Sequence, residues 1–335
     1  MTSTNRRPGS LDFRRAIICA LPHEFDAVEA LFDEHYCSAL VVKHHKDSNL
    51  YSTGRINADY VVLTCLAKMG KVTAGIASSM IRNSFPNIDL TLLVGICGGV
   101  PFPARDTELI LGDVIISHQV IEYDFGRQYP DRFEQKEGVL DILDRSNQEI
   151  RSFLSWLQTR TEKDRFQDIH NGYIQFLEQK DLKWQYPGAH QDLLFSSSGQ
   201  QVNVEPESNH NCDNIECQGK LVKRRRLAQQ GVPKALVHLG LIASGDTVMK
   251  SAKHRDELAR IFPIIGFEME GAGVYNSLSC LIIKGACDYA DSHKNKVWQN
   301  YAAASAAACA KTLLKRLGEL RIECTPPYVP SGSNR

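Results

Sequence analysis

Near the C-terminus, acidic residues occur at two positions where a carboxylate without a binding partner would be unfavourable in the folded protein. Glu268 and Glu270 directly precede small and apolar residues that predict a helix over 270–278. Asp288 ends an apolar stretch from Cys280 that predicts a buried strand. A carboxylate is costly to bury unless something engages it, and α/β folds bind ligands at strand ends. These acids are therefore the first candidates for a ligand site.

Other segments that could border such a site end in an acid or are rich in glycine. Glu24 follows the apolar segment Ala16–Leu21 and opens a predicted helix over 24–32. Leu92–Val100 contains three glycines, which would let its backbone approach a ligand closely. Further blocks of this kind are Lys68–Val72, Leu111–Ile115 and Gly240–Asp246. One glycine-rich loop would be weak evidence, but an ordered set is more specific.

In this order the blocks resemble the nucleoside phosphorylase/nucleosidase superfamily, whose members break the N-glycosidic bond of nucleosides. One departure is that Lys68–Val72 lacks the first glycine of the family's turn into a helix. The resemblance implies an α/β, three-layer fold with a twisted mixed central sheet flanked by helices, here with a large insert. The alternation of apolar strands with helical patterns independently indicates an α/β layer fold.

The resemblance also implies a role for each acid. Asp288 would be the general acid that protonates the departing purine; burial would favour the protonated form that this role requires. Glu270 would bind the ribose hydroxyls, and Glu24 would activate the attacking water. Ordinary alternatives are a loop cap for Asp288, a helix N-terminal acid for Glu270 and a surface acid for Glu24. Glu268 is expected to be structural.

The glycine-rich segment distinguishes water from phosphate as the nucleophile. Bacterial-type hexameric phosphorylases of this superfamily carry an arginine and a serine here to bind phosphate, where this chain has Leu93 and Ile96. Apolar side chains cannot satisfy the oxygens of a phosphate dianion, so hydrolysis is favoured. A phosphate-dependent purine nucleoside phosphorylase remains the first alternative. A non-catalytic module that binds a nucleotide or oligomerises is the second.

Base and sugar contacts are expected from the residues around these acids. Family relatives place them in the glycine-rich loop, beside the paired acids and after the Ser-Gly-Asp block. The aromatic ring that stacks on the base is expected from Phe125, Phe267 or Trp298. The complete set of expected substrate-binding residues is Glu270, Met269, Gly95, Cys97, Gly98, Phe267, Val248, Met249 and Trp298.

A cationic stretch follows Asp288, which is unusual for an enzyme that acts on uncharged nucleosides. The segment 289–299 resembles the nucleosidase-like domain of fungal immune-receptor-like proteins, as do 123–127 and 185–190. That subgroup includes enzymes acting on adenine nucleotides such as ATP. The expected candidates for a 5′-phosphate site are Lys294, Lys296, Arg127 and Lys71, with a solvated charge run as the alternative. Adenosine, methylthioadenosine, AMP and ATP all remain possible substrates.

Composition restricts the partners. The 335 residues carry 39 basic and 39 acidic side chains, so no net field favours nucleic acid or a membrane. The sequence contains no apolar run of the roughly 20 residues that a membrane span needs.

Ten cysteines, several in apolar strands, favour a reducing, cytoplasmic location. Cys212, Cys217 and His210 are too few for a structural zinc site. The hydrolytic mechanism that the resemblance implies requires no metal or cofactor, so none is expected. The family resemblance implies a homo-oligomer.

The chain divides into one domain and two tails. The tails are 1–13 and 323–335, and the domain spans 14–322 with an insert over 128–235. Within the insert, Val139–Trp156 has helical spacing, and 196–226 is a polar loop ending in a basic run over 223–226. That run is expected to be solvated, with nucleic acid or an import receptor as alternatives. Strands are expected at 16–20, 60–65, 90–95, 113–117, 236–242 and 281–285, and further helices at 71–83 and 299–317.

Overall fold

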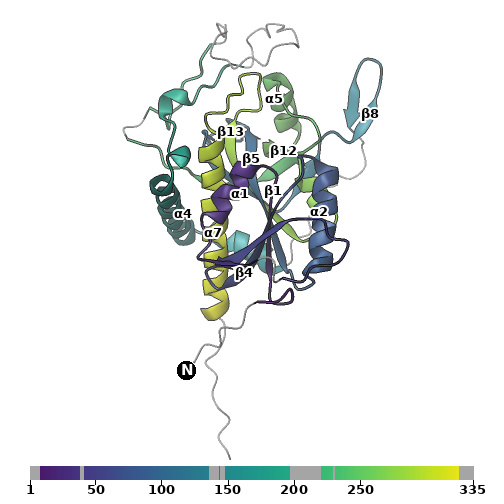
Figure 1. Cartoon of the computed structure of the whole chain (residues 1–335). Helices are drawn as coiled ribbons and strands as arrows, with labels where there is room; N and C mark the ends of the chain where they lie inside the picture. Colours follow the sequence, from purple (N-terminus) through teal and green to yellow (C-terminus); the bar gives the residue numbers. More distant parts are fainter. Residues whose placement is uncertain are drawn as a thin grey trace, which may run out of the picture.

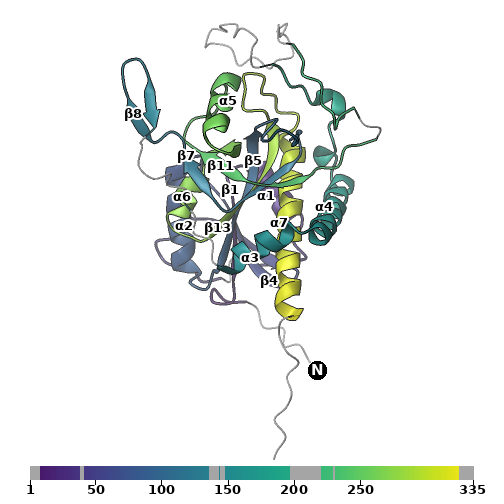
Figure 2. The same ribbon diagram turned by 180° about the vertical axis from the view of Figure 1, so that it is seen from behind.

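A twisted mixed sheet forms the centre of the molecule and is covered by helices on both faces, as the opposite views in Figures 1 and 2 show. The computed structural model describes residues 8–37, 41–135, 143, 148–196, 220–228 and 231–323. The three-layer α/β fold class that the sequence predicted is confirmed.

The long path of the sheet brings several strand ends together. Its strands run in the order β10 (Val237–Leu239), β6 (Val114–Ser117), β13 (Cys280–Asp288), β5 (Leu90–Gly99), β1 (Arg15–Cys19), β4 (Asp59–Cys65), β3 (Tyr51–Ile56) and β2 (Glu34–Tyr36). Neighbours from β13 to β4 are parallel, whereas β6 is antiparallel to β13. β1, β5 and β13 are buried almost throughout, as expected of parallel strands covered on both faces. Their carboxyl ends therefore lie at one edge of the sheet.

Short strands extend the sheet at that edge. β12 (Ile264–Glu268) pairs antiparallel with the end of β5, so that Phe267 stands opposite Gly98. β11 (Leu241–Ser244) joins β12 to β7 (Val120–Glu122). The hairpin of β8 (Gly126–Gln128) and β9 (Phe133–Gln135) projects from the body (Figures 1 and 2). The β5–β12 pairing places the paired acids of the sequence beside the glycine-rich strand end.

Two groups of helices cover the sheet. α1 (Pro22–Glu29), α4 (Arg160–Lys180) and α7 (Gln299–Glu323) pack together on one face, and α2 (Lys71–Ser84) packs with α6 (Gly271–Tyr275) on the other (Figures 1 and 2). The remaining α-helices are α3 (Gln148–Leu157) and α5 (Ala252–Ile261). α7 is rich in alanine, the best helix former, and its side chains over 301–314 are buried against the sheet.

Most expected elements are present with shifted ends, but two expectations differ. The single strand expected at 236–242 is two strands, β10 and β11, which pair with different neighbours on either side of Gly240. The helix expected over Val139–Trp156 is described only as α3, from Gln148; most of 139–147 lies outside the described residues. α4 was not predicted, because its few buried apolar residues stand in a largely charged sequence.

Some expectations fall on residues that are not described. These are most of both tails, most of the polar loop 196–226, and the trio His210, Cys212 and Cys217. Among the described residues, no helix combines the length and the apolar character needed to cross a membrane.

Candidate active site

A pocket of about 350 Å³ opens where β1, β5, β12 and β13 end. It brings together Glu24, Glu270 and Asp288, which lie far apart in the sequence. Nearly all other expected substrate-binding residues join them: Cys97, Gly98, Val248, Met249, Phe267 and Met269. The structure therefore assembles the candidate acids and the candidate sugar and base contacts around one cavity.

Glu24 is held at the pocket by three backbone N–H groups. Pro22 begins α1, and Glu24 reaches back so that its Oε2 accepts hydrogen bonds from Ala20 N at 2.8 Å and Leu21 N at 2.9 Å. Its Oε1 accepts from Ile96 N of β5 at 2.8 Å. The side chain is buried, and this burial raises the pKa of Glu24 above the ordinary value. A buried carboxylate of raised basicity is suited to taking a proton from water.

Gly95 explains how Glu24 fits so close to β5. A Cβ at Gly95 would collide with the carboxylate of Glu24. The first glycine of the segment therefore provides room for this acid, so the expected direct substrate contact is not what the geometry shows. Gly95 does not line the pocket.

Glu270 shares a buried cation with Glu268. Lys284 Nζ lies 3.2 Å from Glu270 Oε2 and 3.7 Å from Glu268 Oε2. Glu268 also accepts hydrogen bonds from the backbone N–H groups of Glu270 and Gly271, both at 2.9 Å. Burial raises the pKa of Glu268, while the neighbouring carboxylates raise the pKa of Lys284. Glu268 thus positions the turn before α6, and Glu270 presents its carboxylate to the pocket.

Lys284 is a residue that the sequence reasoning missed. It stands in the middle of the buried strand β13 and is 1% exposed. The sequence could have identified it, because a lysine inside an apolar strand needs a buried group of opposite charge.

Asp288 lies at the end of β13 with a cation beside it. Lys294 Nζ is 2.9 Å from Asp288 Oδ1 and 3.0 Å from Oδ2. Ala290 N donates a hydrogen bond to Oδ1 at 2.8 Å, so the side chain also fixes the turn that follows the strand. A Cβ at Gly98 would come within 2.9 Å of the same oxygen. Glycine is required here for the close approach of β5 to the acid.

The apolar part of the pocket is formed by β12 and the segment after β11. Phe267 and Met249 are buried, and the ring of Phe267 meets Tyr123 edge-on at 5.6 Å between centroids. Burial raises the pKa values of Cys97 and Cys287, so these thiols are neutral and unsuited to nucleophilic attack. Among the described residues, no group of three or more metal-binding side chains is found.

Two expected aromatic contacts are not brought to this pocket. Trp298 is fully buried, packs edge-on against Tyr186 and Tyr301, and donates its indole N–H to Gln191 O at 3.0 Å. It anchors the start of α7. Phe125 is 54% exposed, just before the β8 hairpin. Of the three aromatic candidates, Phe267 alone lines the pocket.

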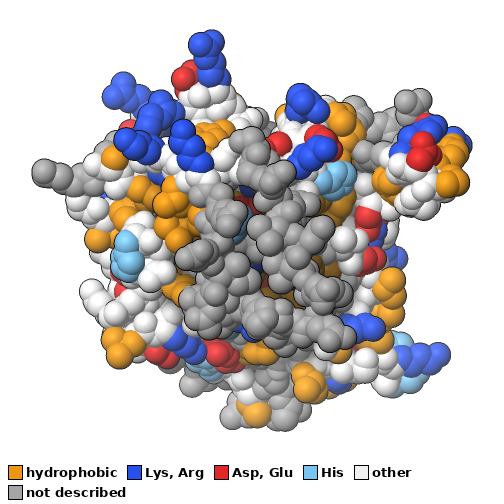
Figure 3. Space-filling model, turned by 90° about the horizontal axis from the view of Figure 1, so that it is seen from above, with side chains coloured by type: hydrophobic (Ala, Val, Ile, Leu, Met, Phe, Trp, Pro, Cys, Tyr) orange, Lys and Arg blue, Asp and Glu red, His pale blue; other side chains and the backbone are white. Residues whose placement is uncertain are grey.

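The expected phosphate-binding residues divide into two pairs. Lys294 and Lys296 line the pocket, together with Lys250 and Asn295, which the sequence reasoning did not select. Lys71 instead lies 2.7 Å from Asp124 and 3.5 Å from Glu122, and Arg127 is exposed on the hairpin. Seen from above, the face toward which β5 and β13 run carries Lys and Arg side chains around its rim (Figure 3).

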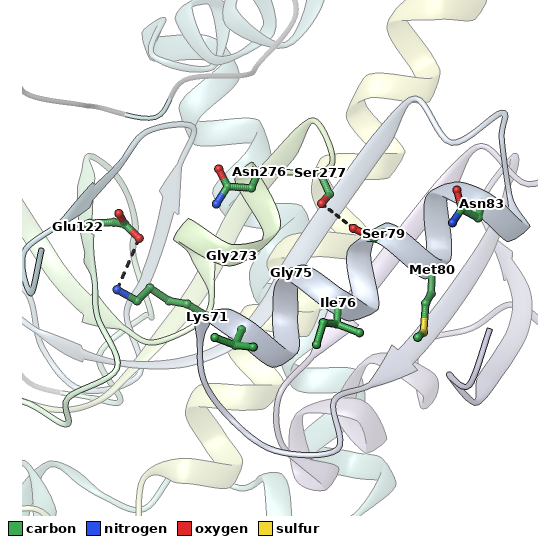
Figure 4. Close-up of a pocket in the computed structure, with 11 residues that line it drawn as sticks. Lys71, Gly75, Ile76, Ser79, Met80, Asn83, Glu122, Gly273, Asn276 and Ser277 are labelled. Atoms are coloured by element: carbon green, nitrogen blue, oxygen red, sulfur yellow. Dashed lines mark hydrogen bonds and ion pairs between the residues drawn. The ribbon is translucent and has the colours of Figure 1, made fainter. Parts of the chain in front are cut away.

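Lys71 lines a second pocket, of about 520 Å³, which lies between α2 and α6 (Figure 4). Its ammonium points toward Glu122, while the hydroxyl of Ser79 in α2 lies 3.0 Å from that of Ser277, just after α6. Neither the candidate catalytic acids Glu24 and Asp288 nor the candidate ribose-binding acid Glu270 lines this pocket. Although this cavity is the larger of the two, it lacks the candidate acids that line the first pocket.

The basic run over 223–226 is solvated only in part, because Lys223 and Arg225 are exposed whereas the other two residues are not. Arg224 is 5% exposed, and its Nε donates to Glu108 at 2.8 Å while Nη1 donates to Tyr289 Oη at 2.5 Å. Arg226 pairs with Asp113, which is also buried. The arginines therefore tie the insert to the core, directly beside the residue that follows Asp288.

Comparisons with known proteins agree with this architecture. A protein from Hyaloscypha variabilis described as a nucleotide-binding leucine-rich repeat (NLR)-like protein is 34% identical over 306 residues, which cover 89% of this chain. The chain spans only 28% of that relative's length. The 5′-methylthioadenosine/S-adenosylhomocysteine nucleosidase of Mycobacterium bovis is 22% identical, over 90% of this chain and 95% of the relative.

Solved structures give the same fold. Futalosine hydrolase of Helicobacter pylori superposes with a TM-score of 0.55 at 15% identity, over 91% of this chain and 98% of that structure. The family model of the phosphorylase superfamily matches residues 14–317. This chain therefore belongs to the phosphorylase superfamily.

Proposed function

We propose that this protein hydrolyses the N-glycosidic bond of purine nucleosides or nucleotides and releases free adenine. The observation that carries the proposal is the meeting of Glu24, Glu270 and Asp288 around one pocket. Membership of the phosphorylase superfamily and the similarity to a methylthioadenosine/S-adenosylhomocysteine nucleosidase support this reaction class.

The three acids divide the reaction between them. Asp288, as a carboxylic acid, gives its proton to N7 of the purine while the electrons of the C1′–N9 bond move to the base. Glu24 takes a proton from a water molecule as the water oxygen bonds to C1′. The products are free base and free sugar; Asp288 then regains a proton and Glu24 releases one to solvent. Glu270 accepts hydrogen bonds from the ribose hydroxyls and stabilises positive charge on the ring.

Water is favoured over phosphate by the end of β5. Leu93 is fully buried in the sheet, and the backbone N–H of Ile96 is already bound to Glu24. These positions offer a phosphate dianion no cationic side chain. The same hydrogen bond holds Glu24 where it can activate water.

Adenine nucleotides, ATP among them, are the substrates that the lysines of the pocket favour. Lys294, Lys296 and Lys250 line the same cavity as the acids, and a nucleoside alone has no negative charge for them. Phe267 and Met249 provide an apolar surface for the flat base. The similarity to an NLR-like protein is consistent with a nucleotide-consuming domain of a larger receptor.

A substrate panel tests the proposal. The purified protein is incubated with adenosine, inosine, AMP and ATP, with and without inorganic phosphate, and the bases are separated by chromatography. We expect adenine without added phosphate and a higher rate with ATP than with adenosine. Strict dependence on phosphate would contradict hydrolysis, and binding without any product would indicate a non-catalytic module.

A further inference from the structure

We propose that the insert sets the preference for phosphorylated substrates, because it holds the loop over 289–298 where Lys294 and Lys296 reach the pocket. Phe195 and Gln191 of the insert are positioning residues that act through this loop and not on the substrate. The inference rests on the proposed function, which assigns the two lysines to the phosphates of a nucleotide. It adds which part of the chain determines that specificity.

The loop over 289–298 connects β13 to α7 and carries the two lysines near its middle. Lys294, Asn295 and Lys296 all line the candidate active site. A long lysine side chain loses conformational freedom when it binds a phosphate. A backbone that is already fixed leaves less freedom to be lost, so the hold on the loop contributes to the affinity for a nucleotide.

Insert residues contact the loop on both sides of the lysines. On the N-terminal side, the ring of Phe195 stacks on the ring of His293, with 4.1 Å between the centroids and 24° between the planes. On the C-terminal side, Trp298 donates its indole N–H to Gln191 O at 3.0 Å, and Tyr186 packs edge-on against the same indole. The segment that carries the lysines therefore lies between two side chains that the insert holds.

The part of the insert that makes these contacts is itself fixed. Asp192 Oδ2 accepts a hydrogen bond from Leu111 N, in the segment before β6, at 2.9 Å. Two backbone hydrogen bonds, each of 2.9 Å, join the insert segments 194–196 and 220–222. Phe195 therefore has a restrained backbone from which it can restrain the loop.

Asp288 has contacts of its own that do not involve the insert. It ends β13 and pairs there with β5, and its Oδ1 accepts a hydrogen bond from Ala290 N at 2.8 Å. Arg255 of α5 donates to Tyr289 O at 2.6 Å, which fixes the first residue of the loop. Loss of the stacked ring of Phe195 should therefore release the lysines while the acid keeps its place. Cleavage of adenosine, which has no phosphate, should then continue.

Phe195→Leu tests the inference, because it removes the stacked ring and keeps an apolar side chain. We expect KM for ATP to rise about 3- to 10-fold, since the lysines must then be ordered during binding. The kcat for ATP and the kcat/KM for adenosine should stay near the wild-type values, because only the binding of phosphate is weakened. Phe195→Tyr keeps the ring and should retain the wild-type KM for ATP.

A double-mutant cycle shows whether Phe195 acts through the lysines. In a background that carries Lys294→Met and Lys296→Met, Phe195→Leu should change KM for ATP by less than about twofold, because the positioned groups are already absent. Trypsin, which cleaves after lysine, gives a readout that does not depend on activity. Phe195→Leu should accelerate cleavage after Lys294 and Lys296 in the folded protein, since the loop opens more readily.

Two control variants show the effect of comparable substitutions elsewhere. Phe176→Leu, at an exposed position of α4 within the insert, and Lys253→Met, at an exposed position of α5, should change the kinetics of neither substrate. Equal losses with adenosine and ATP, or an undiminished effect of Phe195→Leu in the background without the two lysines, would overturn the inference while hydrolysis stands. An unchanged KM for ATP or unchanged tryptic cleavage in Phe195→Leu would overturn it as well. No adenine from any substrate would contradict the proposed function itself.

Discussion

The ammonium of Lys284 lies 3.2 Å from a carboxylate oxygen of Glu270, in the interior of the protein. β13 carries the lysine, and the turn before α6 carries the glutamate. Glu268 and Glu24 also act on this cation electrostatically. One buried lysine thus balances a cluster of buried acids, and the candidate ribose-binding group depends on it.

Lys284→Met is expected to destabilise the protein by about 3–5 kcal/mol at pH 7, because it leaves buried carboxylates without a counter-charge. The loss should shrink at pH 5. Burial already raises the pKa values of Glu24 and Glu268, and without the lysine they protonate more readily, so ionisation opposes folding increasingly as the pH rises. Urea unfolding at both pH values measures this. An equal loss at pH 5 and pH 7, or a loss matched by Lys253→Met, would contradict it.

Asp288→Asn is expected to keep the fold and to lose adenine release by about 100- to 10,000-fold, because an amide cannot supply the proton. Asp164→Asn, at an exposed position of α4, is the matched control. Circular dichroism verifies folding, and chromatography measures adenine. Unchanged release by the Asp288 variant would remove it from the reaction.

Glu24→Gln should likewise abolish most hydrolysis, since an amide cannot accept a proton from water. In the wild-type protein, burial raises the pKa of Glu24, so the acid limb of kcat/KM should lie above the ordinary glutamate value of about 4.3. Activity increases with pH through this limb as Glu24 becomes a carboxylate. If the residual activity of Glu24→Gln still shows this acid limb, the limb reports the ionisation of another group.

Glu270→Gln tests ribose binding through a pair of substrates. We expect kcat/KM for adenosine to fall by about 10- to 100-fold, because hydrogen bonds to a charged acceptor are lost. The fall should be smaller for 2′-deoxyadenosine, which has one hydroxyl fewer to offer. Damage to the fold through Lys284 would affect both substrates equally. Equal losses would therefore indicate a structural role alone.

Local sequence could predict the parts of the site that depend on strand ends. Glu24 and Asp288 each follow a predicted strand, and α/β sheets bind ligands at strand ends. Glu270 was predicted only to begin a helix, and its place beside the other two acids was implied by the family resemblance. Sequence could not predict which lysines reach the pocket. Lys71 and Lys294 look equally available, but the fold turns the first toward Asp124 and the second toward Asp288.

The features that the sequence did not predict depend on contacts between residues far apart in the chain. Arg224 looked like part of a solvated basic run, yet its partners Glu108 and Tyr289 come from segments far away in the sequence. Trp298 stands close to the lysines in sequence, but the start of α7 turns its ring into the core. Such contacts depend on how the insert folds back onto the sheet, which no local pattern encodes.

The identity of the sugar product tests the central claim most directly. Wild-type protein is incubated with adenosine and with ATP in phosphate buffer, and the sugar released with adenine is identified by nuclear magnetic resonance. Hydrolysis by Glu24 and Asp288 predicts a sugar with a free anomeric hydroxyl: ribose from adenosine and ribose 5-triphosphate from ATP. A sugar 1-phosphate as the main product would contradict the account, because phosphate would then be the nucleophile.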